Sequence, residues 1–466
     1  MALQPNENND DSVLKFESML KTDDVYFFDA DDFEGIIHHY LNIGKVSLGK
    51  KAIQIGLQQH PHSVELKLLR VEVLVFEDNF KPAELLLDEL QTIDNRNEEI
   101  FVQRANILSK QDDHQGAVNM LLEALHIADD SFDIYSLLGM EYLFMDDFEQ
   151  AKNSFIKCLQ FDENDYSSLY NVIYCYEFLE DYDGAIVYLN DYLERNPYCE
   201  VAWHQLGKMF FTKKMYQEAL AAFDFAIISD ESFLGAYFEK GRILEKLGKY
   251  NEAIESYQTT INIDDPTSHA YLRIGRCHEL LGNDDLAKYY YYNTVHEDPL
   301  LDKGWLAITE FYTKKKDYAK AQRYINKAIN IDGENALYWK KNAKIFVALN
   351  NLDEADFAFK QSVDLGNYEL ETWQEWATVL QKLNDYHSAV QVLLQGLEFY
   401  PDNAEMSYQL SGLYLKTDQI ALAKQKLGDA LQLNSEKAVF FKKKFPEFVS
   451  IKWVKDIFSE DKKAST

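Results

Sequence analysis

The chain has 466 residues, 47% of them hydrophobic, so it is long and apolar enough to bury a large core. Its formal net charge of −31 repels nucleic acid and anionic membrane surfaces, which argues against both as partners. Its four cysteines form no C-x2-C pair, which argues against a zinc ribbon, and we expect them to be small buried hydrophobic residues.

The amino-terminal part of the chain is the more acidic part. Residues 1–200 contain 14 Lys and Arg against 40 Asp and Glu, while the remainder contains 33 against 38. This acidic lobe either keeps an aromatic-rich chain in solution or docks a basic partner. The first twelve residues have neither an apolar run nor a basic lead, and no stretch approaches the ~20 apolar residues that span a bilayer. We therefore expect a cytoplasmic protein without a signal peptide.

Three apparent motifs near the amino terminus are weak. Residues 44–51, GKVSLGKK, resemble a phosphate loop, but Lys51 replaces the Ser or Thr that binds magnesium, and no strand precedes them. The acidic run of residues 29–34 lacks the spaced glycine and distal glutamate of a calcium loop, so it is expected to cap a helix start. The spacing of the four nearby histidines does not suit a metal site; they are His38, His39, His60 and His62. We expect no cofactor and no metal.

From residue 83 onward, alanine recurs at a fixed interval of 34 residues. The eleven positions are Ala83, Ala117, Ala151, Ala185, Ala219, Ala253, Ala287, Ala321, Ala355, Ala389 and Ala423. A period of this length predicts one helical hairpin copied along the chain, and a small residue at one phase marks the closest approach of its two helices.

The copy that starts near residue 200 shows the whole pattern. Four residues share one face of a first helix by their i, i+3, i+4, i+7 spacing: Trp203, Leu206, Gly207 and Phe210. Ala219 and Phe223 form an i, i+4 pair on a second helix, and the two faces are predicted to meet. Proline closes several copies at one phase, at Pro61, Pro197, Pro299 and Pro401.

These residues resemble the tetratricopeptide repeat, whose pattern is W-x2-L-G-x2-Y, then A-x3-F, then P. The resemblance covers about twelve copies. It implies an all-α solenoid, a right-handed superhelix of antiparallel helix pairs in which the first helices line a concave groove. The predicted organisation is an acidic extension (1–29), the repeat solenoid (30–437), a capping helix region (438–459) and a tail (460–466).

The carboxyl end of the chain has two interpretations. Phe441 and Phe448 lie on the phases of Trp203 and Phe210, so residues 436–459 begin a thirteenth copy that breaks off and caps the solenoid. Alternatively, its lysines among aromatic residues lie on an anionic membrane. Pro446 interrupts a long interfacial helix, which favours the cap.

The repeats leave about 29 residues at each end, too few for a separate catalytic domain, and no catalytic motif is present. We therefore predict a protein that is not an enzyme. It is either an adaptor that binds a protein or peptide in its groove, or a permanent structural subunit of a larger assembly. A helper that presents substrate to a separate enzyme is a further alternative.

The resemblance places one stripe of first-helix residues in the groove. The predicted ligand-binding residues are Tyr170, Tyr174, His204, Lys208, Phe211, Arg242, Arg273, Arg276, Lys340, Lys341 and Lys344. The basic members favour an acidic partner segment. The alternative is that nearby acids neutralise them, namely Glu239, Glu279, Glu310 and Glu375. The carboxylate clamp of some family members is not reproduced, because Lys340 is followed one turn later by Lys344 rather than asparagine.

Overall fold

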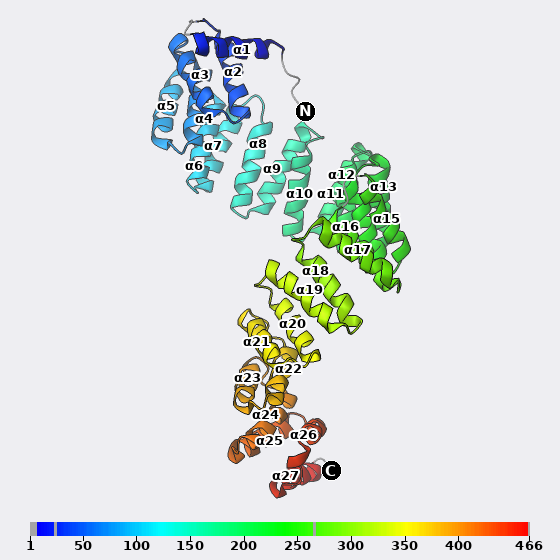
Figure 1. Cartoon of the computed structure of the whole chain (residues 1–466). Helices are drawn as coiled ribbons and strands as arrows, with labels where there is room; N and C mark the ends of the chain where they lie inside the picture. The colour runs from blue at the N-terminus through cyan, green and yellow to red at the C-terminus, as the bar shows by residue number, and fades with distance from the viewer. Residues whose placement is uncertain (1–6, 23–25, 264–266, 465–466) are drawn as a thin grey trace. The chain divides into compact units, whose positions relative to one another are not determined.

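The computed structural model describes residues 7–22, 26–263 and 267–464, and the chain divides into two units, Met1–Glu231 and Ser232–Thr466. The described residues contain 27 α-helices and one short 3-10 helix, with no strand among them (Figure 1). The all-α prediction is confirmed.

The described residues of the first unit form thirteen helices. They are α1 (Glu7–Thr22), α2 (Ala30–Asn42), α3 (Val46–Gln59), α4 (Val64–Phe76), α5 (Phe80–Ile93), α6 (Glu98–Lys110), α7 (His114–Ile127), α8 (Phe132–Phe144), α9 (Phe148–Phe161), α10 (Tyr166–Phe178), α11 (Tyr182–Arg195), α12 (Glu200–Thr212) and α13 (Tyr216–Ser229).

The second unit contains the remaining helices. They are α14 (Leu234–Lys246), α15 (Tyr250–Ile263), α16 (Ser268–Leu280), α17 (Asp284–Glu297), α18 (Asp302–Lys314), α19 (Tyr318–Ile331), α20 (Ala336–Ala348), α21 (Leu352–Asp364), α22 (Leu370–Lys382), α23 (Tyr386–Phe399), α24 (Ala404–Lys416), α25 (Ile420–Leu433), α26 (Ala438–Lys444), η1 (Pro446–Phe448) and α27 (Lys452–Ala464).

From α2 to α25, each even-numbered helix forms an antiparallel hairpin with the next odd-numbered helix, and we call them first and second helices (Figure 1). The turn between them contains a residue with positive φ, a conformation that residues other than glycine adopt infrequently. This residue recurs every 34 positions, at Gly44, Asp78, Asp112, Asp146, Glu180, Lys214, Gly248, Gly282, Lys316, Asn350, Asn384 and Asp418. The period of the sequence is thus also a period of the backbone.

Capping explains where many second helices begin. In five of them an aspartate side chain accepts a hydrogen bond from the backbone N–H three residues later, which satisfies one of the free donors at the helix start. These N-caps are Asp113, Asp147, Asp181, Asp317 and Asp385. The four prolines of the period all lie in the turn that follows a second helix.

The packing predicted from the 34-residue period is confirmed, because all eleven alanines of the series are fully buried. On the facing first helix, several copies have a glycine beneath an aromatic ring of the second helix. A Cβ on Gly207 would lie 2.7 Å from Phe223, and one on Gly241 would lie 2.6 Å from Tyr257. These are contacts that only glycine permits.

In several copies the large residue that begins the pattern lies at the rim of the core, which differs from the prediction for Trp203. Three tryptophans, Trp203, Trp305 and Trp339, are half-buried, and each donates its indole N–H to the carbonyl oxygen six residues earlier, at 2.8–2.9 Å. Phe210 is half-buried as well. The indole needs a hydrogen-bond partner, and the preceding turn supplies it.

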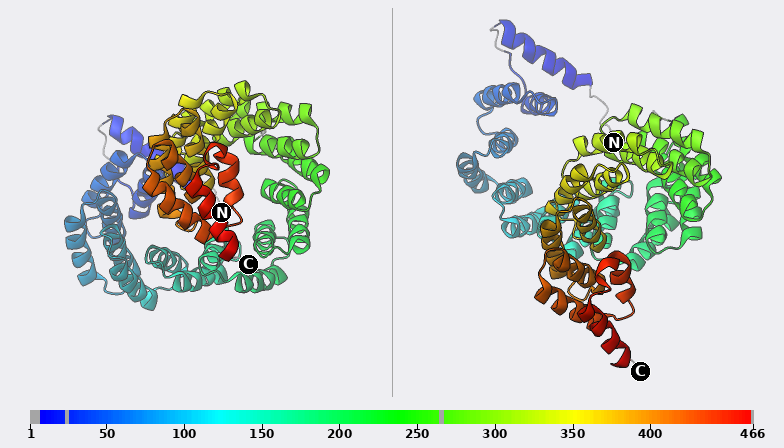
Figure 2. Two further views of the ribbon diagram at one scale, coloured as in Figure 1. Left: turned by 90° about the horizontal axis from the view of Figure 1, so that it is seen from below. Right: turned by 60° about the horizontal axis from the view of Figure 1, so that its bottom comes forward.

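Both ends of the repeat region are covered by further helices. In α1, the buried side chains Val13, Phe16 and Met19 share a core with Phe33 of α2. At the other end α26 contacts α24, and α27 contacts α25 (Figure 2).

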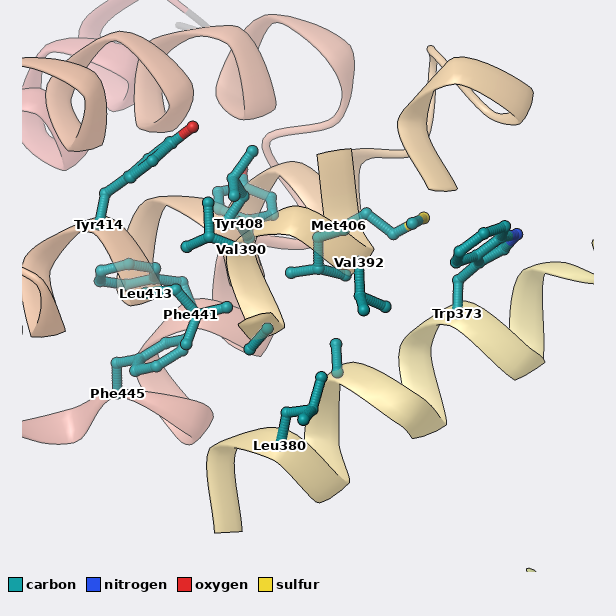
Figure 3. Close-up of a cluster of buried hydrophobic side chains, with 14 of the residues drawn as sticks. Trp373, Leu380, Val390, Val392, Met406, Tyr408, Leu413, Tyr414, Phe441 and Phe445 are labelled. Atoms are coloured by element: carbon teal, nitrogen blue, oxygen red, sulfur yellow. The ribbon is translucent and has the colours of Figure 1, made fainter. Parts of the chain in front are cut away.

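The carboxyl-terminal aromatic residues lie in the core of the second unit. Phe441 and Phe445 are buried in the same cluster as Trp373, Tyr408 and Leu413 (Figure 3). Helix α26 ends just before Pro446, as the sequence indicates. Buried rings cannot insert into a membrane, so Phe441 and Phe445 do not form a membrane-binding surface.

Candidate partner-binding groove

The first helices of the second unit line two adjoining pockets. We call these two pockets together the groove. One pocket, of about 540 Å³, lies between α18 and α20. The other, of about 370 Å³, is lined by α20, α22, α24 and α26. Lys344 borders both pockets, so they adjoin at α20.

The groove is basic although the chain is acidic. Five lysines line it, Lys314, Lys341, Lys344, Lys382 and Lys444, against two glutamates, Glu310 and Glu375. Apolar side chains lie between these charges and include Ile345, Val347, Val379 and Phe440. A lining of this kind suits a segment with acidic and apolar residues.

Two predicted residues, Lys341 and Lys344, lie in the groove, and each forms ion pairs with neighbouring helices. Lys341 Nζ lies 2.7 Å from Glu310 Oε1, and Lys344 Nζ lies 3.0 Å from Glu371 Oε1 and 3.4 Å from Glu375 Oε1. Part of the basic charge is therefore neutralised, as the alternative interpretation expected.

Lys340 does not line either pocket. Its buried ammonium group lies 2.5 Å from Glu369 and 2.8 Å from Glu371, where it joins α20 to the start of α22. Hydrogen bonds from Lys340 and Lys344 lower the pKa of Glu371 to about 2. Burial has the opposite effect on Glu375 and raises its pKa.

The three predicted arginines lie outside both pockets. Arg242 pairs with Glu239 on its own helix α14, and Arg273 of α16 reaches Glu245 of α14 at 3.2 Å. Arg276 is half-buried on α16. Arg242 and Arg273 thus join structural ion pairs within the hairpin stack.

The other predicted residues belong to the first unit. Tyr170 and Tyr174 are each 44% exposed, and the ring of Tyr174 lies 4.6 Å from that of Phe178. Lys208 lies 3.7 Å from Glu177 and 3.2 Å from Gln205 Oε1.

Two predicted residues on α12 pack against the second helix of the same hairpin. The ring of His204 lies 5.6 Å from Phe223, and burial lowers the pKa of His204 to about 4. Phe211 lies 5.9 Å from Tyr216. The exposed pair Tyr170 and Tyr174 is therefore the more accessible part of the predicted stripe in this unit.

The sequence prediction missed the groove residues beyond α20. Gln374, Glu375 and Thr378 lie one period after Lys340, Lys341 and Lys344, so continuing the same step would have identified them. Lys444 had no such signal, because it lies in the region assigned to the cap.

Two classes of site are absent from the described part of the chain. No group of three or more His, Cys, Asp or Glu side chains there is arranged to hold a metal ion. No helix in the same residues combines the length and the apolar character needed to cross a bilayer.

Comparisons with known proteins agree with this architecture. Models of the tetratricopeptide repeat match residues 132–165, 234–266, 269–300 and 303–335, and each match begins within one residue of the start of a first helix. The chain is a helical repeat protein of stacked hairpins. These matches identify it as a tetratricopeptide repeat protein.

One curated relative is anaphase-promoting complex subunit 3 of Schizosaccharomyces pombe, 28% identical over 141 residues. The match covers 30% of this chain and 21% of that protein, so the chain spans about a fifth of the relative's length.

Solved structures of repeat proteins are also similar to this chain. The APC/C hetero-tetramer Cut9–Hcn1 has 15% identity and a TM-score of 0.39, with 89% of this chain and 92% of that chain covered. A tetratricopeptide repeat protein of Parabacteroides merdae has 15% identity and a TM-score of 0.41. The match covers 54% of this chain and 99% of that chain.

Proposed function

We propose that this protein is a non-catalytic scaffold that binds an acidic and apolar segment of a protein partner in the groove of its second unit. The observation that carries the proposal is the groove lining, in which five lysines and several apolar side chains surround two adjoining pockets of an otherwise acidic chain. Association between such surfaces is steered by charge and held by buried apolar contacts.

The proposed organisation follows the period of the sequence. The repeat solenoid spans residues 30–437 in about twelve copies, follows an acidic extension (1–29) that contains α1, and ends in a cap (438–459). The proposed location is the cytoplasm. All four cysteines are free and buried, which suits a reducing compartment.

The experiment is capture of partners from the native source, with the wild type compared with the double variant Lys341→Glu, Lys344→Glu. The matched control is Lys327→Glu, Lys360→Glu, which changes the net charge equally at exposed positions on the second helices α19 and α21. Partner recovery is expected to fall at least about tenfold for the groove variant and to stay unchanged for the control. Undiminished capture by a folded groove variant would contradict the proposal.

A second candidate function is a permanent structural subunit. The similarity to a protein named as a subunit of the anaphase-promoting complex favours it. So do Phe76, Phe144 and Phe178, which occupy one phase of the repeat in the first unit and are each more than half exposed. Washing the captured complex at 1 M salt separates the two candidates, because a charge-steered groove releases its ligand and a large apolar interface retains it.

A further inference from the structure

The pocket of about 370 Å³ beside α26 differs from the rest of the groove because a residue from outside the repeats completes it. Lys444 is the last residue of α26, and its Nζ lies 3.1 Å from the Oγ1 of Thr378 on α22. It also lies 5.4 Å from the ring centre of Phe440. The capping helix thus contributes an ammonium group to a pocket formed by the first helices.

Lys444 has no acidic partner among the residues whose side chains the structure describes. No carboxylate oxygen of the residues with described side chains lies within ion-pair distance of its Nζ, unlike Lys340, Lys341 and Lys344. The surrounding protein lowers the pKa of Lys444 to about 8 through burial. A buried ammonium group without a counter-charge is unfavourable for folding, and an external carboxylate would relieve that penalty.

A second donor in the same pocket is Gln409 of α24. This side chain is 1% exposed, and its Nε2 has no hydrogen-bond partner within the described part of the chain. Buried amide groups are normally paired, so a free N–H in a pocket wall favours a ligand that brings an acceptor. Lys444 and Gln409 both line this pocket, and Gln409 Nε2 is covered by neighbouring atoms.

The remaining charges of the pocket leave it positive. Lys344 and Lys382 add two ammonium groups, and Glu375 is the one acid of the lining. Glu375 Oε1 forms an ion pair with Lys344 at 3.4 Å. Glu375 Oε2 is buried and has no hydrogen-bond partner among the described residues. The walls also include Val347, Val379 and Phe440, so the occupant needs an apolar part beside its anionic group.

We propose that this pocket binds the carboxylate of an acidic side chain, together with a neighbouring apolar side chain, from an internal segment of a protein partner. Lys444 and Gln409 donate hydrogen bonds to the carboxylate, and Val347, Val379 and Phe440 contact the apolar neighbour. Because Lys344 borders both pockets, the segment continues into the pocket between α18 and α20. The proposal rests on the proposed function and names the specificity site within that groove.

The test uses defined peptides and the full chain. The long probe is a fluorescent twelve-residue peptide, blocked at both ends, with two leucine–glutamate pairs at its centre, and its counterpart has glutamine in place of glutamate. The short probe is the blocked tripeptide Leu-Glu-Leu, which fills one pocket only. Affinities are measured by anisotropy for the long probes and by calorimetry for the short one, with the wild type, Lys444→Met, Gln409→Leu and the control Lys443→Met, an exposed neighbour on α26.

Lys444→Met and Gln409→Leu are each expected to lower the affinity for the glutamate peptides at least about tenfold. Each is also expected to abolish the preference for glutamate over glutamine. Lys443→Met is expected to bind as the wild type does. The melting temperature of Lys444→Met is expected to equal or exceed that of the wild type, because an unpaired buried charge is removed. A purely structural lysine would give the opposite shift.

The outcomes separate this inference from the proposed function. If Lys444→Met and Gln409→Leu bind the long glutamate peptide as the wild type does, while Lys341→Glu, Lys344→Glu loses it, the groove stands and the pocket assignment is wrong. Suppose that Lys444→Met weakens binding of the tripeptide, while Lys341→Glu, Lys344→Glu captures partners as the wild type does. The pocket assignment is then supported, and the proposed function of the groove is wrong. Binding only of a peptide with a free carboxyl end would overturn the internal-segment assignment.

Discussion

The Cβ position of Gly207 lies 2.7 Å from the Cε1 atom of Phe223, so the ring of the second helix fills the space that any other residue would need on the first. The same relationship joins Gly139 to Phe155 at 2.5 Å. In these hairpins the aromatic ring of the second helix packs against the glycine of the first helix. The two helices can approach this closely because glycine has no side chain.

Gly207→Ala is expected to destabilise the protein by about 1 to 3 kcal/mol, because the added methyl group displaces a buried ring. Gly428→Ala is the control. No atom lies within 4 Å of a Cβ placed at Gly428 in α25, so alanine there is expected to be neutral or to stabilise by about 0.5 to 1 kcal/mol. Denaturant melts of both variants check the prediction, and equal stabilities would contradict the contact.

The positive-φ turn residues predict a reciprocal pair of substitutions. Lys316 has φ 60° and is expected to gain about 0.5 to 1 kcal/mol on replacement by glycine, which adopts this conformation without steric penalty. Gly248, with φ 74° and open space around its Cβ position, is expected to lose about 1 kcal/mol in Gly248→Lys. Thermal melts that shift both variants in the same direction would rule out backbone strain as the cause.

His204 predicts a loss of stability in mild acid. Burial lowers its pKa from 6.5 to about 4, so the unfolded chain binds a proton more readily than the folded one. The contribution of His204 to the free energy of unfolding is complete above pH 6.5. It falls by about 2 to 3 kcal/mol as the pH drops toward 4.

Unfolding at pH 7 and pH 4.5 measures this effect. The difference between the two conditions is expected to shrink in His204→Gln and to persist in His62→Gln, where the histidine is exposed. An undiminished pH dependence in His204→Gln would show that other groups cause it.

Glu245 links two hairpins of the second unit. It accepts a hydrogen bond from the hydroxyl of Tyr257 at 2.6 Å and lies 3.2 Å from Arg273. Glu245→Ala is expected to cost about 1 to 3 kcal/mol, since it leaves both partners without their acceptor. The exposed pair of Glu252 with Lys249 is the comparison, and Glu252→Ala is expected to change stability by less than about 0.5 kcal/mol. Thermal melts with similar losses for both variants would argue against the link.

The hairpin packing could be predicted because it depends on residue size at positions that recur every 34 residues. The burial of Ala219 and the close approach at Gly207 both follow from that recurrence. The rim position of Trp203 did not follow, because apolar spacing identifies a helix face without showing that the indole N–H requires the Pro197 carbonyl. Helix α1 was also missed, since it lies outside the repeats and Phe16 has no counterpart at the period.

The groove could be predicted only in part. Spacing placed Lys340 and Lys344 on one helix surface, but it could not show that Lys340 turns toward Glu369 in the loop before α22. That outcome depends on how far α22 approaches α20. Lys444 could not be found by any periodic rule, because it enters the groove from the cap through its contact with Thr378.

The most direct test of the groove is hydrogen–deuterium exchange on the full chain, with and without the captured natural partner. Slower exchange is expected in α18, α20 and α22, with α4 to α10 unchanged. Slower exchange confined to α4 through α10 would contradict this expectation and assign the binding face to the acidic amino-terminal lobe.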